Sequence, residues 1–371
     1  MMTNKVFILI LILLTVASCE EEIDLVSDKF EESMVVEGMI TNKPGPYTVR
    51  ISKTAPVDKP EYNPYSGCIV IIRDNSGNSE NLTEVSPGVY KTSETGMQGQ
   101  TGNSYSLEIH TPEGKVYATD YQEIKQPVAI DTVYASVEYE DELGSNNDVP
   151  GYRFYLSTET ANSNDTYFVW MFEETYEYTA DYQLASTLYK GQWEYNFDPD
   201  TLYRCWRTRI LGNVFTEQTT NLSVPKITDK PLFFVDNKTK RLQIRYSIQA
   251  RQYIVNRDTY LFWDNIKDRL SGGNFIQLEQ PFQVESNVYN VNNNEESVLG
   301  YFTVASVSEK RIFIDPSIPI NHEKCFIDTE LDYIYQMSMH EKLYFAGNGM
   351  VDKYCVDCRE KGGKTTEPDF W

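Results

Sequence analysis

Catalytic signatures are missing from this sequence. It has only three histidines, His110, His322 and His340, and none stands in the paired spacing of a zinc protease such as His-Glu-x-x-His. A Gly-x-Ser-x-Gly turn for a serine nucleophile is absent, as is a Gly-x-x-x-x-Gly-Lys loop for phosphate. Paired carboxylates for glycoside cleavage cannot be picked out among 55 acidic residues. The sequence therefore predicts a protein that is not an enzyme and has no metal or cofactor site.

Basic residues are also scarce, with 33 Lys and Arg against 55 Asp and Glu and a net charge of -22. A surface of this sign repels phosphate backbones and anionic lipid headgroups. We therefore expect no nucleic-acid partner. After the first 18 residues, no apolar run approaches the roughly 20 residues that a membrane-spanning helix needs.

The first two dozen residues have the three-part form of a secretory signal. Lys5 precedes an apolar run from Val6 to Leu14, and Val16-Ala17-Ser18 leads to Cys19. This ending resembles the bacterial lipobox, in which the cysteine is linked to diacylglycerol and, after cleavage, acylated on its new N-terminus. We expect residues 1–18 to be a lipoprotein signal peptide and Cys19 to carry the lipid that contacts the membrane. An ordinary cleaved signal with an incidental cysteine is the alternative.

Residues 19–33 are charged and without periodicity, which predicts an acidic flexible tether. The run Glu20-Glu21-Glu22 resembles the acidic export tag of Bacteroidetes lipoproteins, which are sent to the outer face of the outer membrane. A solvated tether with no address is the alternative. The expected location is the outer membrane, lipid-anchored and facing the cell exterior.

Short strands and turns fill residues 34–125. Val35-Val36-Glu37-Gly38 and Tyr47 to Ser52 flank a Lys43-Pro44-Gly45-Pro46 turn, and further strand-like runs follow at regular spacing. Spacing of this kind predicts an immunoglobulin-like β-sandwich over residues 34–125. The fold class is thus mainly β.

The remainder, residues 126–371, is predicted to be a larger β-rich domain with one substantial helix. The helix is expected near residues 257–270, with Asn256 as its N-cap and Ser271-Gly272-Gly273 ending it. The aromatic, acidic stretch from Glu173 to Phe197 has no clear period, so we expect irregular loops or an extended hairpin there.

Five cysteines follow Cys19. Cys68 lies in an apolar strand and is expected to be a buried free thiol. Cys205, Cys325, Cys355 and Cys358 are candidates for two structural disulfides, for which three connectivities exist. Four thiolates would also suit a zinc ion, and Cys-x-x-Cys occurs in redox proteins.

Tyrosine is unusually frequent, at 27 residues. Half-buried rings stack on sugars or pack against protein partners. The sequence therefore offers a ligand or partner platform, with core filling by a β domain as the alternative, at Tyr176, Tyr178, Tyr182, Trp193, Tyr195 and Trp206.

An acidic cluster is the remaining candidate for a ligand site. Its oxygen atoms would suit calcium. It lacks the order of an EF-hand loop, so a solvated loop is the competing interpretation, at Glu138, Glu140, Asp141 and Glu142.

Several strings together resemble the Bacteroidetes outer-membrane lipoproteins that carry domain of unknown function 4249. In chain order they are Val35-Val36-Glu37-Gly38, Tyr203-Arg204-Cys205-Trp206, Tyr246-Ser247-Ile248, Tyr260-Leu261-Phe262-Trp263, Val298-Leu299-Gly300-Tyr301-Phe302, Cys355-Val356-Asp357-Cys358-Arg359 and Pro368-Asp369-Phe370-Trp371. The resemblance implies neighbouring genes for TonB-dependent receptors and no assigned catalytic activity.

These observations lead to one expected function and one alternative. We expect a surface lipoprotein that assists a TonB-dependent barrel in binding or taking up a nutrient. The alternative is a structural or adhesive envelope protein acting through its immunoglobulin-like domain. No cofactor is expected beyond the lipid on Cys19.

Overall fold

The computed structural model describes residues 32–56, 59–141, 148–161, 165–196, 198–220, 222–271 and 286–371. Residues 1–18, Cys19 and most of the tether lie outside these ranges, as do Glu142, Phe197 and the predicted helix stop Gly272-Gly273. In the described part, the strands form four sheets and helices are few, so the mainly β fold is confirmed. No described helix is long and apolar enough to cross a membrane.

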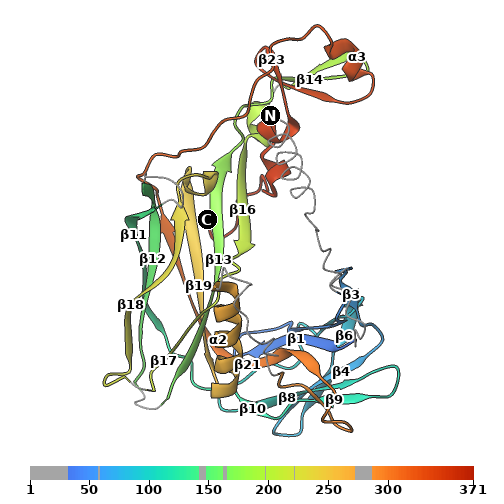
Figure 1. The fold of residues 1–371 in the computed structure, drawn as a ribbon, viewed down its shortest axis with the longest axis vertical. Coiled ribbons are helices and arrows are strands. Elements are labelled where there is room, and N and C mark those ends of the chain that lie inside the picture. The colour runs from blue at the N-terminus through green and yellow to red at the C-terminus, as the bar shows by residue number, and fades with distance from the viewer. Residues whose placement is uncertain are drawn as a thin grey trace, which may run out of the picture.

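The largest sheet runs through most of the molecule (Figure 1). Two short strands lie beside its path: β17 (Phe215–Gln218) pairs with β13, and β3 (Asn63–Pro64) pairs with β2. The strands along the path are, in order, β16 (Arg204–Ile210), β13 (Tyr167–Thr179), β19 (Arg245–Val255), β21 (Val298–Ile314), β1 (Met34–Thr41), β2 (Thr48–Lys53), β7 (Val89–Lys91) and β6 (Thr83–Ser86).

The N-terminal part is a sandwich in which the β1 end of this sheet faces a second sheet. Apolar side chains at alternate strand positions meet between the two sheets, among them Val49, Ile51, Val70, Ile72 and Leu107. The second sheet contains β20 (Tyr289–Asn290), β9 (Val116–Ala118), β8 (Ser104–His110), β4 (Ile69–Asp74) and β5 (Ser79–Asn81), with β10 (Gln122–Glu123) on β8.

Residues 34–125 do not complete this sandwich alone. β1 pairs in parallel with β21, from Met34 opposite Val298 to Thr41 opposite Ala305. Gly300 has a φ of 82°, and a Cβ there would lie 2.1 Å from the Val36 carbonyl oxygen, so only glycine permits this approach. The sandwich core also includes side chains from the distant segment, namely Val288, Val298, Phe302 and Val304.

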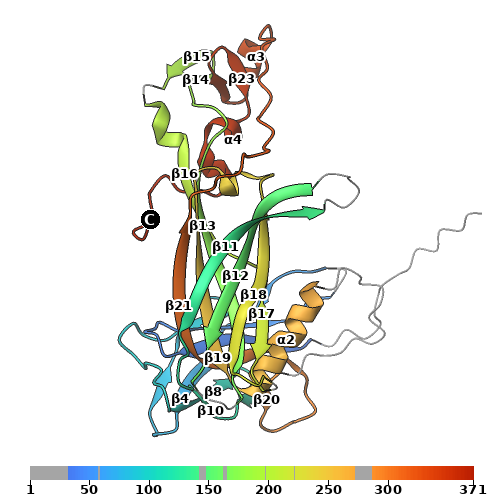
Figure 2. The same cartoon turned by 90° about the vertical axis from the view of Figure 1, so that its left-hand side faces the viewer.

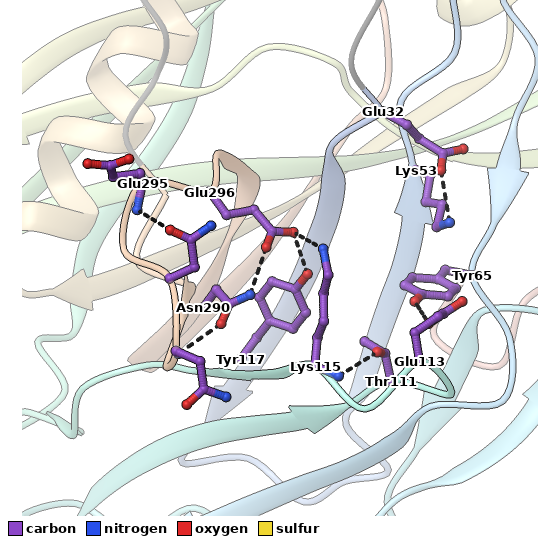
Figure 3. Close-up of polar contacts among 12 residues, drawn as sticks. Glu32, Lys53, Tyr65, Thr111, Glu113, Lys115, Tyr117, Asn290, Glu295 and Glu296 are labelled. Atoms are coloured by element: carbon purple, nitrogen blue, oxygen red, sulfur yellow. Dashed lines mark hydrogen bonds and ion pairs between the residues drawn. The ribbon is translucent and has the colours of Figure 1, made fainter.

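Polar contacts tie the same segment to β9 (Figure 3). The Glu296 carboxylate accepts hydrogen bonds from Lys115 Nζ at 2.9 Å, Tyr117 Oη at 2.6 Å and Asn290 Nδ2 at 2.7 Å. Tyr117 is buried, so its hydroxyl requires such a partner. The expected boundary near residue 125 therefore does not separate two units, because the chain returns to the first sandwich after α2 (Arg257–Ser271).

A second sandwich adjoins the first (Figure 1). Its small sheet contains β11 (Ile130–Asp141), β12 (Asp148–Glu159) and β18 (Lys226–Asp236), and it covers β13 and β19 of the large sheet (Figure 2). Phe154, Trp170, Phe172 and Tyr246 are fully buried between them. Burial of these large rings stabilises the central part of the chain.

The predicted helix is confirmed as α2. Asn256 Oδ1 accepts a hydrogen bond from the Thr259 backbone amide at 2.7 Å, which is the expected N-cap. On its buried side, Tyr260 packs against Tyr167 of β13, with ring centroids 5.3 Å apart.

A third, smaller unit lies at the end of the molecule opposite the N-terminal sandwich (Figures 1 and 2). The stretch from Glu173 continues β13 to Thr179 and then forms a hairpin of two short strands, β14 (Ser186–Tyr189) and β15 (Gln192–Tyr195). The unit consists of β15 (Gln192–Tyr195), β14 (Ser186–Tyr189), β22 (Leu343–Ala346) and β23 (Gly349–Val351), with α3 (Ile334–Ser338), α4 (Lys353–Val356), and the 3-10 turns η1 (Pro199–Leu202) and η4 (Cys358–Lys361).

The last residues lie against the large sheet. The Arg311 guanidinium sits 3.7 Å from the ring centroid of Phe370, and Arg245 lies 5.9 Å from that of Trp371. Trp371 Nε1 also donates to Glu177 Oε2 at 3.3 Å. The closing Pro-Asp-Phe-Trp string thus holds the end of the chain on strands β13, β19 and β21.

Candidate functional site

Two disulfides hold the distal unit: one connects it to β16 of the large sheet, and the other lies within the unit's own core. Cys205 of β16 is bonded to Cys358 of η4, with Cα atoms 5.8 Å apart, and Cys325 is bonded to Cys355 of α4, at 6.0 Å. The structure thereby selects one of the three possible connectivities. The Cys-x-x-Cys string makes no internal bridge, because each of its cysteines bonds to a different partner. Cys68 is a buried free thiol, as expected.

The zinc alternative fails for these four cysteines. Asp181, Cys325 and Cys355 offer ligand atoms within 4.8 Å of one another, but both sulfurs belong to a disulfide and are not thiolates. The Asp181 carboxylate is already used: it is paired with Lys240, lies 3.0 Å from His322 Nε2, and accepts from the Cys325 amide at 3.2 Å.

Three members of the predicted aromatic platform pack inside the molecule and do not form an exposed aromatic surface. Tyr176 and Tyr178 are buried in the central core. The Tyr178 hydroxyl donates to the Cys358 carbonyl at 2.6 Å, and that of Tyr182 donates to the Cys325 carbonyl at 2.8 Å. For these three residues the core-filling alternative holds, because η4 and the two disulfides cover the end of β13 and the turn after it.

Trp206 is separate from the other aromatic residues. It lies on β16 and exchanges backbone hydrogen bonds with Lys364, both at 2.8 Å. Its Nε1 is buried and has no hydrogen-bond partner among the described residues. Trp206 therefore does not share a surface with the residues of the β14–β15 hairpin.

Trp193 and Tyr195 do form an exposed pair. They occupy one face of β15, are 46% and 63% exposed, and stack with ring centroids 6.4 Å apart. Trp193 also packs on Phe345 of β22, at 4.7 Å. The pair continues the small core of Leu188, Leu343 and Phe345 out to the solvent, which makes it a rigid aromatic surface.

A third exposed ring lies at the hairpin turn. Lys190 and Gly191 have φ values of 50° and 72°, as a two-residue turn between twisted strands requires. The Lys190 and Gly191 amides donate to the Ser338 carbonyl and hydroxyl at 2.6 and 3.2 Å. α3 is thereby docked on the turn, and its Tyr335, 65% exposed, lies beside Gly191. We call Trp193, Tyr195 and Tyr335 the aromatic tip.

β15 is also an edge strand of its sheet, and all four of its residues are exposed. Edge strands can accept a strand from another chain through their free backbone groups. Exposed Trp and Tyr on a rigid support are the side chains most often found at the energetic centre of protein interfaces. The aromatic tip is therefore suited to binding a protein partner. Tyr335 was missed in the sequence because nothing in its short helix indicates which hairpin it packs against.

The acidic cluster is organised by neighbouring side chains. Glu138 accepts a hydrogen bond from the Tyr155 hydroxyl, and Glu140 is paired with Arg153. Asp141 ends β11. Glu142 lies outside the described residues. The described carboxylates at positions 138 and 140 are thus occupied in contacts between β11 and β12.

Comparison with known proteins places the chain in a family. The family described as "Domain of unknown function (DUF4249)" matches residues 20–311. The chain belongs to the DUF4249 family. The match covers β1 and most of β21 but ends before the Cys-x-x-Cys string and the closing Pro-Asp-Phe-Trp, so these two strings do not contribute to it.

Other comparisons add little to the family assignment. No curated protein matches this DUF4249 chain. Among solved structures, it is similar to one described as "Crystal structure of tetra-tandem repeat in extending region of large adhesion protein". The identity is 11% and the TM-score 0.16, with 61% of this chain covered. The chain spans about half of that structure, 46%, and a likeness of this size carries no argument about fold or function.

Proposed function

We propose that this DUF4249 protein is a non-enzymatic lipoprotein, anchored through acyl chains on Cys19 in the outer membrane of a member of the Bacteroidetes, and facing the cell exterior. It assists a TonB-dependent barrel in the binding or uptake of a nutrient. The observation that carries the partner role is the aromatic tip, a rigid group of exposed rings beside an open strand edge.

The position of the tip supports this role. The first described residues are fixed to the N-terminal sandwich, since Glu32 pairs with Lys53 at 2.8 Å and the Ser33 amide donates to Thr54 Oγ1 at 3.0 Å (Figure 3 shows the first pair). The aromatic tip belongs to the unit at the opposite end (Figure 1). A lipid anchor joined to the N-terminal sandwich therefore leaves the tip free to meet another protein of the same membrane.

The chemistry of the tip suits a protein surface. Trp193, Tyr195 and Tyr335 combine large apolar area with hydrogen-bonding groups, and their support limits the side-chain entropy that binding would cost. The Cys205–Cys358 disulfide holds that support to β16 of the large sheet. Binding of a partner at the tip would then require no rearrangement of the rest of the protein.

Co-purification tests the proposal. The full chain, tagged at its C-terminus, is isolated from detergent-solubilised outer membranes, and bound proteins are identified by mass spectrometry. We expect a TonB-dependent barrel in stoichiometric amount, and its loss from the double variant Trp193→Ala/Tyr195→Ala. The control, Tyr62→Ala/Tyr139→Ala, removes two rings that are each 66% exposed elsewhere on the protein and should retain the barrel.

Recovery of no barrel, under conditions that preserve known lipoprotein–receptor pairs, would contradict the proposal. Equal retention by both double variants would show that the tip is not the contact. A gene deletion separates the adhesive alternative: loss of growth on one nutrient supports uptake, whereas loss of attachment alone supports adhesion.

A further inference from the structure

A cavity with a strongly cationic lining lies between the second sandwich and the end of the chain. It encloses about 280 Å³. Six of its lining residues are Lys or Arg, and none is Asp or Glu, in a chain whose net charge is -22. The lining consists of Tyr176, Tyr178, Arg207, Arg209, Lys238, Thr239, Lys240, Arg241, His322 and Lys361.

The carboxylates behind this cavity neutralise only part of its charge. Glu174 is fully buried and is shared by Arg209 and Arg241, with Arg241 Nε at 3.0 Å, so two cations meet one anion. Lys240 is paired with Asp181. The cavity keeps an excess of positive charge even after both buried carboxylates are counted.

Two further cations face the cavity without a carboxylate. Among the described residues, neither Arg207 nor Lys361 forms an ion pair; Lys361 Nζ lies 5.2 Å from the ring centroid of Tyr354. The positive charge around the cavity also affects Lys240. Burial lowers the pKa of Lys240, its ion pair with Asp181 opposes this effect, and the charges of Lys361 and Lys324 lower the pKa further. An anion entering the cavity would be attracted by all of these groups.

The rest of the wall is aromatic. Tyr176 and Tyr178 are buried and line the cavity, with ring centroids 5.5 Å apart. A neighbouring cavity of about 240 Å³ shares Arg209 and Arg241 and adds Leu211, Phe233 and Phe234 to its wall. The two arginines thus stand where the cavities adjoin, and planar guanidinium groups bind carboxylate and phosphate in a two-point manner.

We propose that this cationic cavity binds a small organic anion, a molecule with a carboxylate, sulfate or phosphate group on a body the size of one sugar or one dicarboxylic acid. Arg207 and Lys361 take the oxyanion, and the tyrosines contact the body. The inference goes beyond the proposed function, because it depends on the cavity alone and needs neither the anchor nor a barrel. It also explains why cations converge in an otherwise acidic protein.

Calorimetry on the full chain in detergent tests the proposal with four probes: citrate, galacturonate, inorganic phosphate and neutral galactose. We expect citrate or galacturonate to bind at millimolar concentration or below, and galactose not to bind. The variant Arg207→Gln/Lys361→Gln should weaken that binding by about tenfold or more. The charge-matched control Arg50→Gln/Lys91→Gln, on the N-terminal sandwich, should leave it within about twofold.

A labelling experiment on the unmodified protein guards against a variant that folds poorly. Bound citrate should slow the acetylation of Lys361 relative to Lys91. Three results would overturn the proposal: no binding of any anion, equal weakening by both double variants, or no protection of Lys361 at saturating citrate. Binding of inorganic phosphate alone would overturn the assignment of an organic ligand.

Discussion

Cys205 of β16 is bonded to Cys358, which follows it by 153 residues. This bond fixes the last turn of the chain on the large sheet, next to the buried Tyr178 hydroxyl that donates to the Cys358 carbonyl. The chain between the two cysteines, which includes α2, β21, β22 and β23, is closed into one covalent loop, whereas β14 and β15 of the distal unit precede Cys205. The stability of the central and distal parts is therefore coupled.

Removal of the Cys205–Cys358 disulfide should destabilise the chain more than removal of the Cys325–Cys355 disulfide. The variant Cys205→Ala/Cys358→Ala opens a loop that spans 153 residues. The variant Cys325→Ala/Cys355→Ala opens a loop that spans 30 residues. The first should lower the free energy of unfolding by about 2–5 kcal/mol, and the second by about 1 kcal/mol less, because the unfolded chain gains more entropy when a longer loop opens. Denaturant unfolding without reductant measures both, and equal losses would contradict the expectation.

A buried hydrogen bond in the central core gives a second prediction. Trp170 Nε1 donates to Gln252 Oε1 at 2.8 Å, and Gln252 Nε2 donates to the Val128 carbonyl at 2.8 Å. Both side chains are fully buried. Gln252→Leu leaves the indole N–H and that carbonyl unpaired and should cost about 1–3 kcal/mol of unfolding free energy.

The control for that variant is Gln249→Leu. Gln249 lies on the same strand but is only half-buried, so its replacement should change the unfolding free energy by less than about 0.5 kcal/mol. Chemical denaturation followed by tryptophan fluorescence compares the two. A Gln252→Leu protein as stable as the control would show that the bond does not hold the core.

The stability of the chain should fall in acid. Burial alone would raise the pKa of Asp181, but its bonds with Lys240, the Cys325 amide and His322 outweigh burial and hold the pKa below its usual value. A carboxyl group with a lowered pKa stabilises the fold above its unfolded pKa, about 3.9, and this contribution is lost as the pH falls through the folded value. Unfolding free energy should therefore decrease below about pH 4.

Asp181→Asn separates this group from the other carboxylates. The variant should be less stable than the wild type at pH 7 and lose less stability on acidification, because the titrating group is gone. Asp131→Asn, at an exposed position of β11, should follow the wild-type curve. Thermal unfolding at a series of pH values gives the comparison, and parallel curves for wild type and Asp181→Asn would contradict the prediction.

Lipidation makes a prediction about location. Cys19→Ser removes the proposed acceptor for the acyl chains, in which each buried methylene would contribute about 0.8 kcal/mol to membrane binding. The variant protein should leave the membrane fraction, and mass spectrometry of the wild type should find a lipid on Cys19 as the first residue. A wild-type protein with an unmodified N-terminus at another residue would contradict the lipobox interpretation.

Local signals in the sequence predict the local structure. Alternation of apolar residues locates the strands, and Asn256 with the apolar face after it locates α2. The same signals do not reach across the chain. Nothing near Met34 indicates that β1 pairs in parallel with β21, because the packing of the whole sandwich determines which strand lies beside β1.

The candidate site was predicted only in part for the same reason. Trp193 and Tyr195 emerge on an exposed edge, whereas Tyr176 and Tyr178, of the same residue type, are buried. What differs is the cover: η4 and Cys358 lie over the end of β13, and no described segment covers β15. The residues that cover the end of β13 come more than a hundred positions later in the chain, so the local sequence does not show which rings become buried.

The most direct test of the central claim is crosslinking from the aromatic tip in intact cells. A photoreactive amino acid replaces Trp193 or, as the control, Tyr62, which is even more exposed (66% against 46%) but lies in the N-terminal part. We predict that illumination joins position 193 to a TonB-dependent barrel and that position 62 gives little of this product. No barrel adduct at position 193, or equal amounts from both positions, would contradict a partner role for the tip.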